Sequence, residues 1–151
     1  MGPELEKVIL DFSLRMQLLK SVQENGELSD NDLTNRDETI LSILDVRGPV
    51  SVMGIASLAP QISESTVSTN ISKLWKKGLV DKKISPENQR VTLVSLTDKG
   101  AKVVEKIRQN RAKRFQMFFD AINASDEEKA VLLRLFKRGV EYMDKHLEGR
   151  E

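Results

Sequence analysis

The chain of 151 residues lacks cysteine altogether and has a single histidine, His146. Without cysteine it can form no disulfide, no thiolate metal site and no thiol redox switch. One histidine near the C-terminal end offers little to general acid or base catalysis, and we interpret it as a solvated residue near a helix end. No Gly-rich phosphate loop is present. The sequence therefore predicts that the protein is not an enzyme and has no catalytic residues, cofactor or metal.

Long apolar runs are absent as well. No run approaches the roughly 20 residues that a membrane-spanning helix needs. The first residues include Glu4 and Glu6 and have neither the basic nor the apolar segment of a secretory signal. We expect a soluble, cytoplasmic protein. At this length about 68–70% of the unfolded surface can be buried, which suffices for one domain without disulfides or metals.

The formal net charge is only +1, but the charges are unevenly distributed. Residues 1–38 contain nine acidic and four basic residues, whereas residues 63–90 contain six basic and three acidic ones. Residues 97–114 contain seven basic and two acidic ones. A nearly neutral protein with a basic middle can hold a polyanion on one face. Scattered charge on solvated helices explains the composition equally well.

Apolar residues recur with helical spacing along most of the chain. Ser or Thr residues stand where N-caps are expected, and Gly or Pro marks several helix ends. The pattern predicts six helices. The first covers residues 5–22, and the second is capped by Thr34, has Asp37 in its first turn and ends at Gly48. The third is capped by Ser51, the fourth runs from Ser63 to Lys77, the fifth is capped by Thr97, and the sixth begins with the capping box SDEE at 125–128.

The pattern changes between the fourth and fifth helices. Residues 79–84 and 90–96 are short segments rich in β-branched and apolar residues, and the polar run SPENQ at 85–89 joins them. This arrangement predicts a β-hairpin. Three short helices followed by a hairpin make a winged helix-turn-helix. The predicted fold class is therefore mainly α with a small β-hairpin wing.

The fourth helix contains SESTVSTNIS at 63–72, in which six of ten residues are Ser or Thr. These residues are weak helix formers, yet Val67, Ile71 and Leu74 keep a helical apolar stripe. With that stripe towards the core, short hydroxyls and lysines occupy the rest of the helix surface. Such a surface fits a DNA major groove, because hydroxyls pair with base edges or phosphates and lysine neutralises phosphate. The residues concerned are Ser65, Thr66, Ser68, Thr69, Ser72, Lys73 and Lys76.

Taken alone, this helix is more often an ordinary solvated helix than a DNA-reading one. The basic hairpin beside it shifts the interpretation towards DNA. The helix N-terminus at Ser63 adds backbone N–H donors for a phosphate. Trp75, one residue beyond the stripe residue Leu74, is interpreted as a packing residue rather than as the wall of a ligand pocket.

Residues 62–100, ISESTVSTNISKLWKKGLVDKKISPENQRVTLVSLTDKG, resemble the recognition helix, wing and following helix start of the MarR family of bacterial transcriptional regulators. The most specific parts are Ser65-Thr66-Val67, LWKKGLV at 74–80 and LVSLTDKG at 93–100. The helix order is similar to that family over essentially the whole chain. The resemblance implies a single unit, 1–151, with a winged helix-turn-helix at 34–96 and dimerisation helices at 1–24 and 100–148.

The resemblance also implies a function. Members of this family are homodimers that bind pseudo-palindromic double-stranded DNA operators, with the fourth helix in the major groove and the wing tip in the minor groove. We expect a repressor, with a phosphate contact for Lys73, a wing contact for Arg90 and a backbone contact for Ser51. The expected DNA-binding residues are Ser51, Ser63, Ser65, Thr66, Ser68, Thr69, Lys73, Lys76, Lys82 and Arg90.

Two positions depart from the family pattern. The family wing commonly reads Asp-Arg-Arg where this chain has Asn88-Gln89-Arg90, and the Arg that often follows Ser68 is Thr69 here. Lys82 and Lys83 are candidates to compensate. Family members often respond to small phenolic or carboxylic effectors, so release from DNA by such an effector is a further hypothesis. The other common route, cysteine oxidation, is excluded by the composition.

A winged helix that contacts only other proteins is the alternative function, because the fold does not fix the function. This alternative predicts no affinity for nucleic acid at low salt. The basic, hydroxyl-rich fourth helix favours DNA binding, whereas the altered wing slightly favours the alternative.

Overall fold

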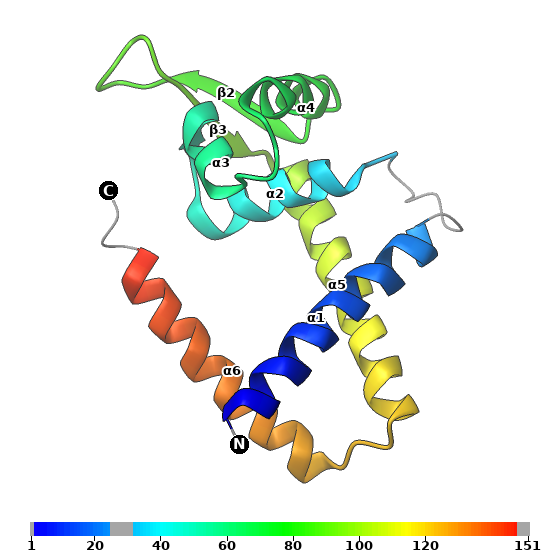
Figure 1. Cartoon of the computed structure of the whole chain (residues 1–151). Helices are drawn as coiled ribbons and strands as arrows, with labels where there is room; N and C mark the ends of the chain where they lie inside the picture. Colours follow the sequence, from blue (N-terminus) through cyan, green and yellow to red (C-terminus); the bar gives the residue numbers. More distant parts are fainter. Residues whose placement is uncertain (1, 25–31, 148–151) are drawn as a thin grey trace. The chain divides into compact units, whose positions relative to one another are not determined.

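The computed structural model describes residues 2–24 and 32–147 and is mainly helical, with one small sheet (Figure 1). Six helices lie within the described residues, as the sequence predicts. The elements are α1 (Gly2–Glu24), α2 (Asn35–Arg47), β1 (Val50–Ser51), α3 (Val52–Leu58), α4 (Glu64–Lys76), β2 (Val80–Ile84), β3 (Thr92–Leu96), α5 (Asp98–Ala121) and α6 (Asp126–Leu147).

Contacts within the chain define two compact units, residues 1–104 and residues 105–151. The first unit contains the helices α2, α3 and α4 and all the described strands, and it begins with α1. The second unit contains most of α5 and the whole of α6. The predicted winged helix-turn-helix therefore lies entirely within the first unit.

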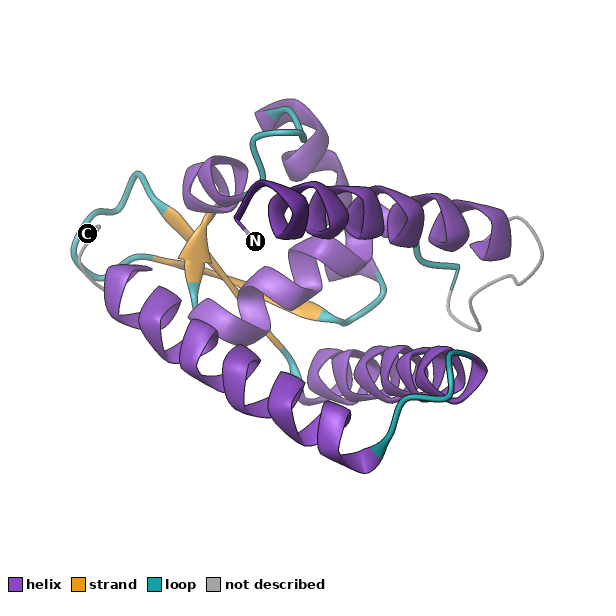
Figure 2. Ribbon diagram, turned by 60° about the horizontal axis from the view of Figure 1, so that its bottom comes forward, coloured by secondary structure: helices purple, strands orange, loops and turns teal. Residues whose placement is uncertain are grey.

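The sheet has three short strands in the order β1-β3-β2, and both pairings are antiparallel (Figure 2). β2 and β3 form the predicted hairpin, with Val80 opposite Leu96. The sequence did not predict β1, in which Val50 and Ser51 pair with residues of β3. A strand of two residues is too short to show an alternating pattern, so periodicity cannot detect it.

The core of the first unit holds α4 by one face. Val67, Ile71 and Leu74 are at most 1% exposed, which confirms the predicted apolar stripe. Fully burying a side chain of this kind contributes about 1.5–3 kcal/mol. These three residues therefore hold α4 against the core and leave its opposite face exposed. The other fully buried large apolar side chains are Ile40, Leu41, Ile55, Val80 and Val94.

Hydroxyl caps begin the short helices where the sequence predicts them. The Ser51 Oγ accepts the backbone N–H of Gly54 at 3.0 Å, and the Ser63 Oγ accepts that of Thr66 at 3.3 Å. Thr34 caps α2 in a reciprocal capping box. Each cap satisfies a donor that the helix itself leaves unpaired.

The start of α5 packs closely against the end of the turn after α4. The Thr97 Oγ1 donates to the Gly78 carbonyl oxygen at 2.6 Å and accepts the backbone N–H of Gly100 at 3.0 Å. A Cβ added to Gly100 would overlap the carbonyl oxygen of Leu79. Glycine at this position therefore allows the helix to approach the backbone that leads into β2.

In the second unit, Ser125 and Glu128 form the predicted capping box of α6. The Ser125 backbone N–H donates to the Glu128 carboxylate at 2.8 Å, and the Glu128 N–H donates to the Ser125 Oγ at 3.2 Å. The hydrogen bonds from Ser125 hold the pKa of Glu128 below its usual range.

Two of the predicted apolar stripes are exposed in the single chain. Both lie on long terminal helices, α1 and α6. Contiguous exposed apolar surface of this kind marks an interaction site more often than isolated exposed residues do. The exposed stripe residues are Leu5, Val8, Ile9 and Phe12 on α1 and Leu132, Leu135, Phe136, Val140 and Met143 on α6.

Candidate nucleic-acid interface

The face of α4 opposite its buried stripe is rich in hydroxyl groups. Short side chains permit close approach of another molecule to the helix, and hydroxyls can both donate and accept hydrogen bonds. This surface therefore has the chemical character that base edges and phosphates require. Ser65, Ser68, Thr69 and Lys76 are exposed, whereas Thr66 and Ser72 are half-buried.

Hydrogen bonds connect the hydroxyls at the N-terminal end of α4. The Ser63 Oγ lies 3.1 Å from the Ser65 Oγ and 2.8 Å from the Thr66 Oγ1. One turn later, the Thr69 hydroxyl donates to the Ser65 carbonyl oxygen at 2.9 Å. A hydroxyl that donates within its own helix keeps its lone pairs for an external donor. Thr69 is therefore positioned to accept a hydrogen bond, such as one from an amino group on a base edge.

A hollow of about 520 Å³ lies along the C-terminal half of α4. Lysines near the last turn of a helix are also favoured by the helix dipole. The combination of hydroxyl donors with positive charge suits a phosphate group. The lining residues are Thr69, Ser72, Lys73, Lys76 and Lys77.

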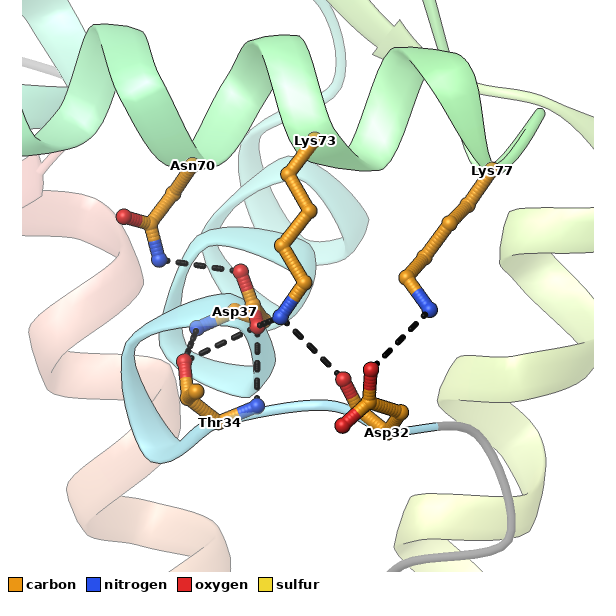
Figure 3. Close-up of polar contacts among 6 residues, drawn as sticks. All are labelled: Asp32, Thr34, Asp37, Asn70, Lys73 and Lys77. Atoms are coloured by element: carbon orange, nitrogen blue, oxygen red, sulfur yellow. Dashed lines mark hydrogen bonds and ion pairs between the residues drawn. The ribbon is translucent and has the colours of Figure 1, made fainter.

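The lysines of this hollow have different surroundings. The Lys73 Nζ donates to the Asp37 Oδ2 at 2.8 Å and to the Asp32 carbonyl oxygen at 3.1 Å (Figure 3). The Lys77 Nζ lies 3.9 Å from the Asp32 carboxylate. Lys76 is exposed and has no hydrogen bond or ion pair with another described residue. The sequence predicts a phosphate contact for Lys73, whereas in the structure its ammonium group lies on a carboxylate of the same chain.

That carboxylate, Asp37, is 0% exposed. Burial raises the pKa of Asp37, but the hydrogen bonds from Lys73 and Thr34 together outweigh burial and hold the pKa below its ordinary value. The carboxylate is therefore ionised at neutral pH and forms a charged pair with Lys73. In the sequence Asp37 is only an acidic residue in the first turn of α2, and nothing there indicates its contact with α4.

Lys82, on β2, lies beside the C-terminal half of α4. Its Nζ is 5.4 Å from the centre of the Trp75 ring and 3.4 Å from the Ser72 Oγ. Trp75 is 52% exposed, so it is not the packing residue that the sequence predicted. Its ring instead attracts the Lys82 ammonium group by a cation–π interaction. This contact brings a wing lysine onto the hydroxyl-rich side of α4.

The turn of the wing is ordered by Asn88. The Asn88 Oδ1 accepts the backbone N–H of Arg90 at 3.0 Å, and the Asn88 carbonyl oxygen accepts the N–H of Val91 at 2.9 Å. An asparagine or aspartate side chain that bonds to the backbone two residues on stabilises a turn. Asn88 thus provides the acceptor that an aspartate would provide at this position. Arg90 lies in this turn, before β3, and is exposed.

Of the predicted site residues, the structure brings four together along the hollow of α4, with Lys82 beside one of them, Ser72; the four are Thr69, Ser72, Lys73 and Lys76. Ser51 and Arg90 lie on other elements: Ser51 is half-buried at the cap of α3, and Arg90 is in the wing turn. Within residues 2–24 and 32–147, no group of three or more His, Cys, Asp or Glu residues is arranged to hold a metal ion. No helix in the same part of the chain is long and apolar enough to cross a membrane.

Short helices α2 to α4, a two-stranded wing and an exposed hydroxyl-rich α4 define a winged helix-turn-helix protein. Residues 33–92 match the model of the MarR family. This part of the chain therefore matches the MarR family of transcriptional regulators, in agreement with the resemblance seen in the sequence. Its relatives are regulators rather than enzymes, which agrees with the prediction from composition.

The similarity to individual proteins extends over most of the chain. The uncharacterized HTH-type transcriptional regulator YpoP of Bacillus subtilis is 28% identical over 127 residues, which cover 83% of this chain and 88% of YpoP. The structure of a MarR family protein from Bacillus stearothermophilus shares the fold, with a TM-score of 0.70, 19% identity and coverage of 93% of this chain and 94% of that one.

A second solved structure contains a ligand. The PcaV transcriptional regulator from Streptomyces coelicolor, in complex with its natural ligand, has a TM-score of 0.60 and 24% identity to this chain. The match covers 86% of this chain and 89% of PcaV. At this identity the comparison shows a shared fold.

Proposed function

We propose that this protein is a sequence-specific double-stranded DNA-binding regulator that acts in the cytoplasm as a homodimeric repressor. Residues 34–96 bind the DNA, with α4 in the major groove and the β2–β3 wing in the adjacent minor groove. The helices at 1–24 and 100–148 form the dimer. The observation that carries this proposal is the exposed surface of hydroxyls and lysine on α4, directly opposite the stripe that holds the helix to the core.

The proposal divides the residues of α4 by their chemistry. Ser65, Ser68 and Thr69 are exposed hydroxyls and contact base edges or nearby phosphates. The helix N-terminus capped by Ser63 contacts a phosphate through its free backbone N–H groups, and Thr66 adds its hydroxyl. Lys76 neutralises a phosphate at the basic hollow.

Lys73 has no phosphate contact in this proposal. Its ammonium group donates hydrogen bonds to the Asp37 carboxylate and to the Asp32 carbonyl oxygen. If Lys73 moved to a phosphate, the buried Asp37 carboxylate would lose its counter-charge. The phosphate contact that the sequence predicts for Lys73 is therefore assigned to Lys76, three residues further along the same helix.

The wing supplies the second set of contacts. Arg90 enters the minor groove, where a narrow groove attracts arginine through its negative potential. Asn88 supports this position by accepting the Arg90 backbone N–H, so the turn does not require an aspartate. Lys82 adds positive charge between the wing and α4, and the Ser51 hydroxyl at the α3 cap contacts the DNA backbone.

Dimerisation follows from the exposed apolar stripes of α1 and α6. A second copy of the chain covers these side chains and removes apolar surface from water. Two winged helices related by a two-fold axis then meet half-sites about one helical turn, roughly 34–36 Å, apart. The operator is accordingly expected to be a pseudo-palindrome.

Repression and effector response are the remaining parts of the proposal. A dimer bound across a promoter blocks access to the same DNA, which makes repression the simplest outcome of tight binding. PcaV, which shares this fold, binds a natural ligand. We therefore include release from DNA by a small phenolic or carboxylic effector in the proposal.

Selection of bound duplexes from a random double-stranded DNA pool tests the function. The proposal predicts enrichment of a palindromic motif, bound by a protein that light scattering shows to be a dimer. Absence of an enriched motif at low salt would favour the alternative, a winged helix that binds only proteins. A stable monomer at micromolar concentration would contradict the dimer architecture.

A further inference from the structure

The carboxylate of Asp37 connects two helices that are distant in sequence. Its Oδ2 accepts hydrogen bonds from the Thr34 backbone N–H at 2.8 Å, the Thr34 hydroxyl at 2.9 Å and the Lys73 Nζ at 2.8 Å. Its Oδ1 accepts one from the Asn70 Nδ2 at 2.9 Å (Figure 3). One buried side chain therefore caps α2 and binds α4 at two positions.

These contacts restrain α4 in a way that its apolar contacts do not. Burial of Val67, Ile71 and Leu74 is non-directional, so by itself it tolerates small rotations and slides of the helix. Hydrogen bonds require donor and acceptor within about 3.2 Å and near-linear geometry. Asn70 and Lys73 are three residues apart and meet different oxygens of one carboxylate, so rotating α4 about its axis strains both bonds.

Base recognition makes this restraint useful. Groups that bind a partner through hydrogen bonds need to be held within roughly 0.5 Å and 10–20° of their working geometry. The hydroxyls that read bases lie on the exposed side of the same helix that Asp37 holds from within. A fixed rotation of α4 thus fixes which base edge each hydroxyl meets.

Stability alone does not explain why this position holds an ion pair. Replacing a buried ion pair by apolar residues of similar volume is often neutral or stabilising, whereas removing one partner is destabilising. Asp37 is fully buried and Lys73 is 35% exposed, so an apolar side chain at position 37 would fill the same space in the core. It would not supply directional contacts to α4.

We infer that Asp37 is a positioning residue for DNA recognition: through Lys73 and Asn70 it fixes the rotation of α4 and thereby the discrimination between DNA sequences. This inference rests on the proposed function. It predicts that the pair governs the ratio of specific to non-specific affinity, which a residue serving stability alone would not change in a protein that remains folded.

The test uses the full chain, the enriched duplex and a scrambled duplex of equal length at one salt concentration. The double variant Asp37→Leu/Lys73→Met removes the polar contacts but keeps side chains of similar length and the same net charge. We expect it to remain folded and to lose roughly tenfold or more of its discrimination ratio, the effect of misplacing a base contact. Asn70→Ala, which removes only one contact, should lower the ratio in the same direction and serves if the double variant does not fold.

Two controls separate positioning from other effects. Leu44→Ala removes a buried apolar side chain of α2 and lowers stability without touching the carboxylate. Lys76→Met removes a charge that faces the DNA. The ratio should stay unchanged in Leu44→Ala, and Lys76→Met should weaken binding to both duplexes alike.

The possible results are distinct. If the folded double variant and Asn70→Ala both keep the ratio within about twofold of the parent, a change too small for a misplaced base contact, the inference is overturned while the proposed function stands. If Leu44→Ala lowers the ratio as much as the double variant does, the effect is one of stability and the inference is equally overturned. If the parent protein does not distinguish the duplexes, the proposed function fails and the inference fails with it.

Discussion

Lys73 and Lys76 provide a matched comparison, because they lie on the same helix and carry the same charge but have different surroundings. The Lys73 Nζ donates to the buried Asp37 carboxylate at 2.8 Å, whereas Lys76 is exposed at the basic hollow of α4. Changing each lysine to Met removes one positive charge per protomer and keeps most of the side-chain length. The lost charge meets a DNA phosphate at Lys76 and a carboxylate of the same chain at Lys73, and only Lys73→Met leaves the buried Asp37 without its counter-charge.

The expected magnitude follows from counterion release. Each phosphate that a protein neutralises contributes about 0.9 to the slope of log K against log salt concentration. A dimer carries two copies of Lys76, so Lys76→Met should reduce the magnitude of this negative slope by roughly 1.8. Lys73→Met should leave the slope nearly unchanged, because in the parent protein the Lys73 charge is already paired with Asp37.

Fluorescence anisotropy of a labelled operator duplex, from about 50 to 200 mM salt, measures both slopes over the range in which counterion release dominates. Chemical denaturation of each variant confirms that it is folded at the temperature used. A slope loss for Lys73→Met equal to that for Lys76→Met would refute the reasoning, since it would mean that Lys73 leaves Asp37 to neutralise a phosphate in the complex.

Two further predictions concern the wing and the buried carboxylate. Asn88→Ala removes the acceptor for the Arg90 backbone N–H, which costs roughly 1 kcal/mol per wing, so it should weaken operator binding about thirtyfold in a two-winged dimer. Asn88→Asp keeps the acceptor and should keep the turn. Equal operator affinities of the two variants in a titration would show that this hydrogen bond is not needed. Because the pKa of Asp37 is lower in the folded state than in the unfolded chain, its stabilisation is present above about pH 4 and is lost as the pH falls through the folded-state pKa. The difference in free energy of unfolding between the parent and Asp37→Asn, measured by urea titration, should therefore shrink as the pH falls from 5 into the acid range. A difference independent of pH would contradict the ionised pair.

Local signals predicted most of the winged helix-turn-helix. The stripe of Val67, Ile71 and Leu74 and the cap at Ser63 involve residues within a few positions of one another, so their spacing reveals α4 directly. The hairpin was equally visible, because β-branched segments flank a polar turn. The comparison with the MarR family then confirmed the class that these patterns indicated.

The features that sequence reasoning missed depend on contacts between distant residues. Asp37 and Lys73 are 36 positions apart, and each alone resembles an ordinary surface charge on a helix. Gly100 gives no signal until the carbonyl oxygen of Leu79 is seen beside it. Trp75 comes directly after the stripe residue Leu74, which suggested packing, but its ring faces Lys82 instead.

The most direct measurement of the central claim is a repeated duplex selection with Thr69→Ala beside the parent protein. Thr69 is exposed on the face of α4 opposite the core, and its hydroxyl keeps an acceptor for a base edge. If α4 reads the operator, the palindromic motif should change at one symmetric pair of positions and remain the same elsewhere. An unchanged motif, with affinity lowered equally for all sequences, would contradict base reading by this helix.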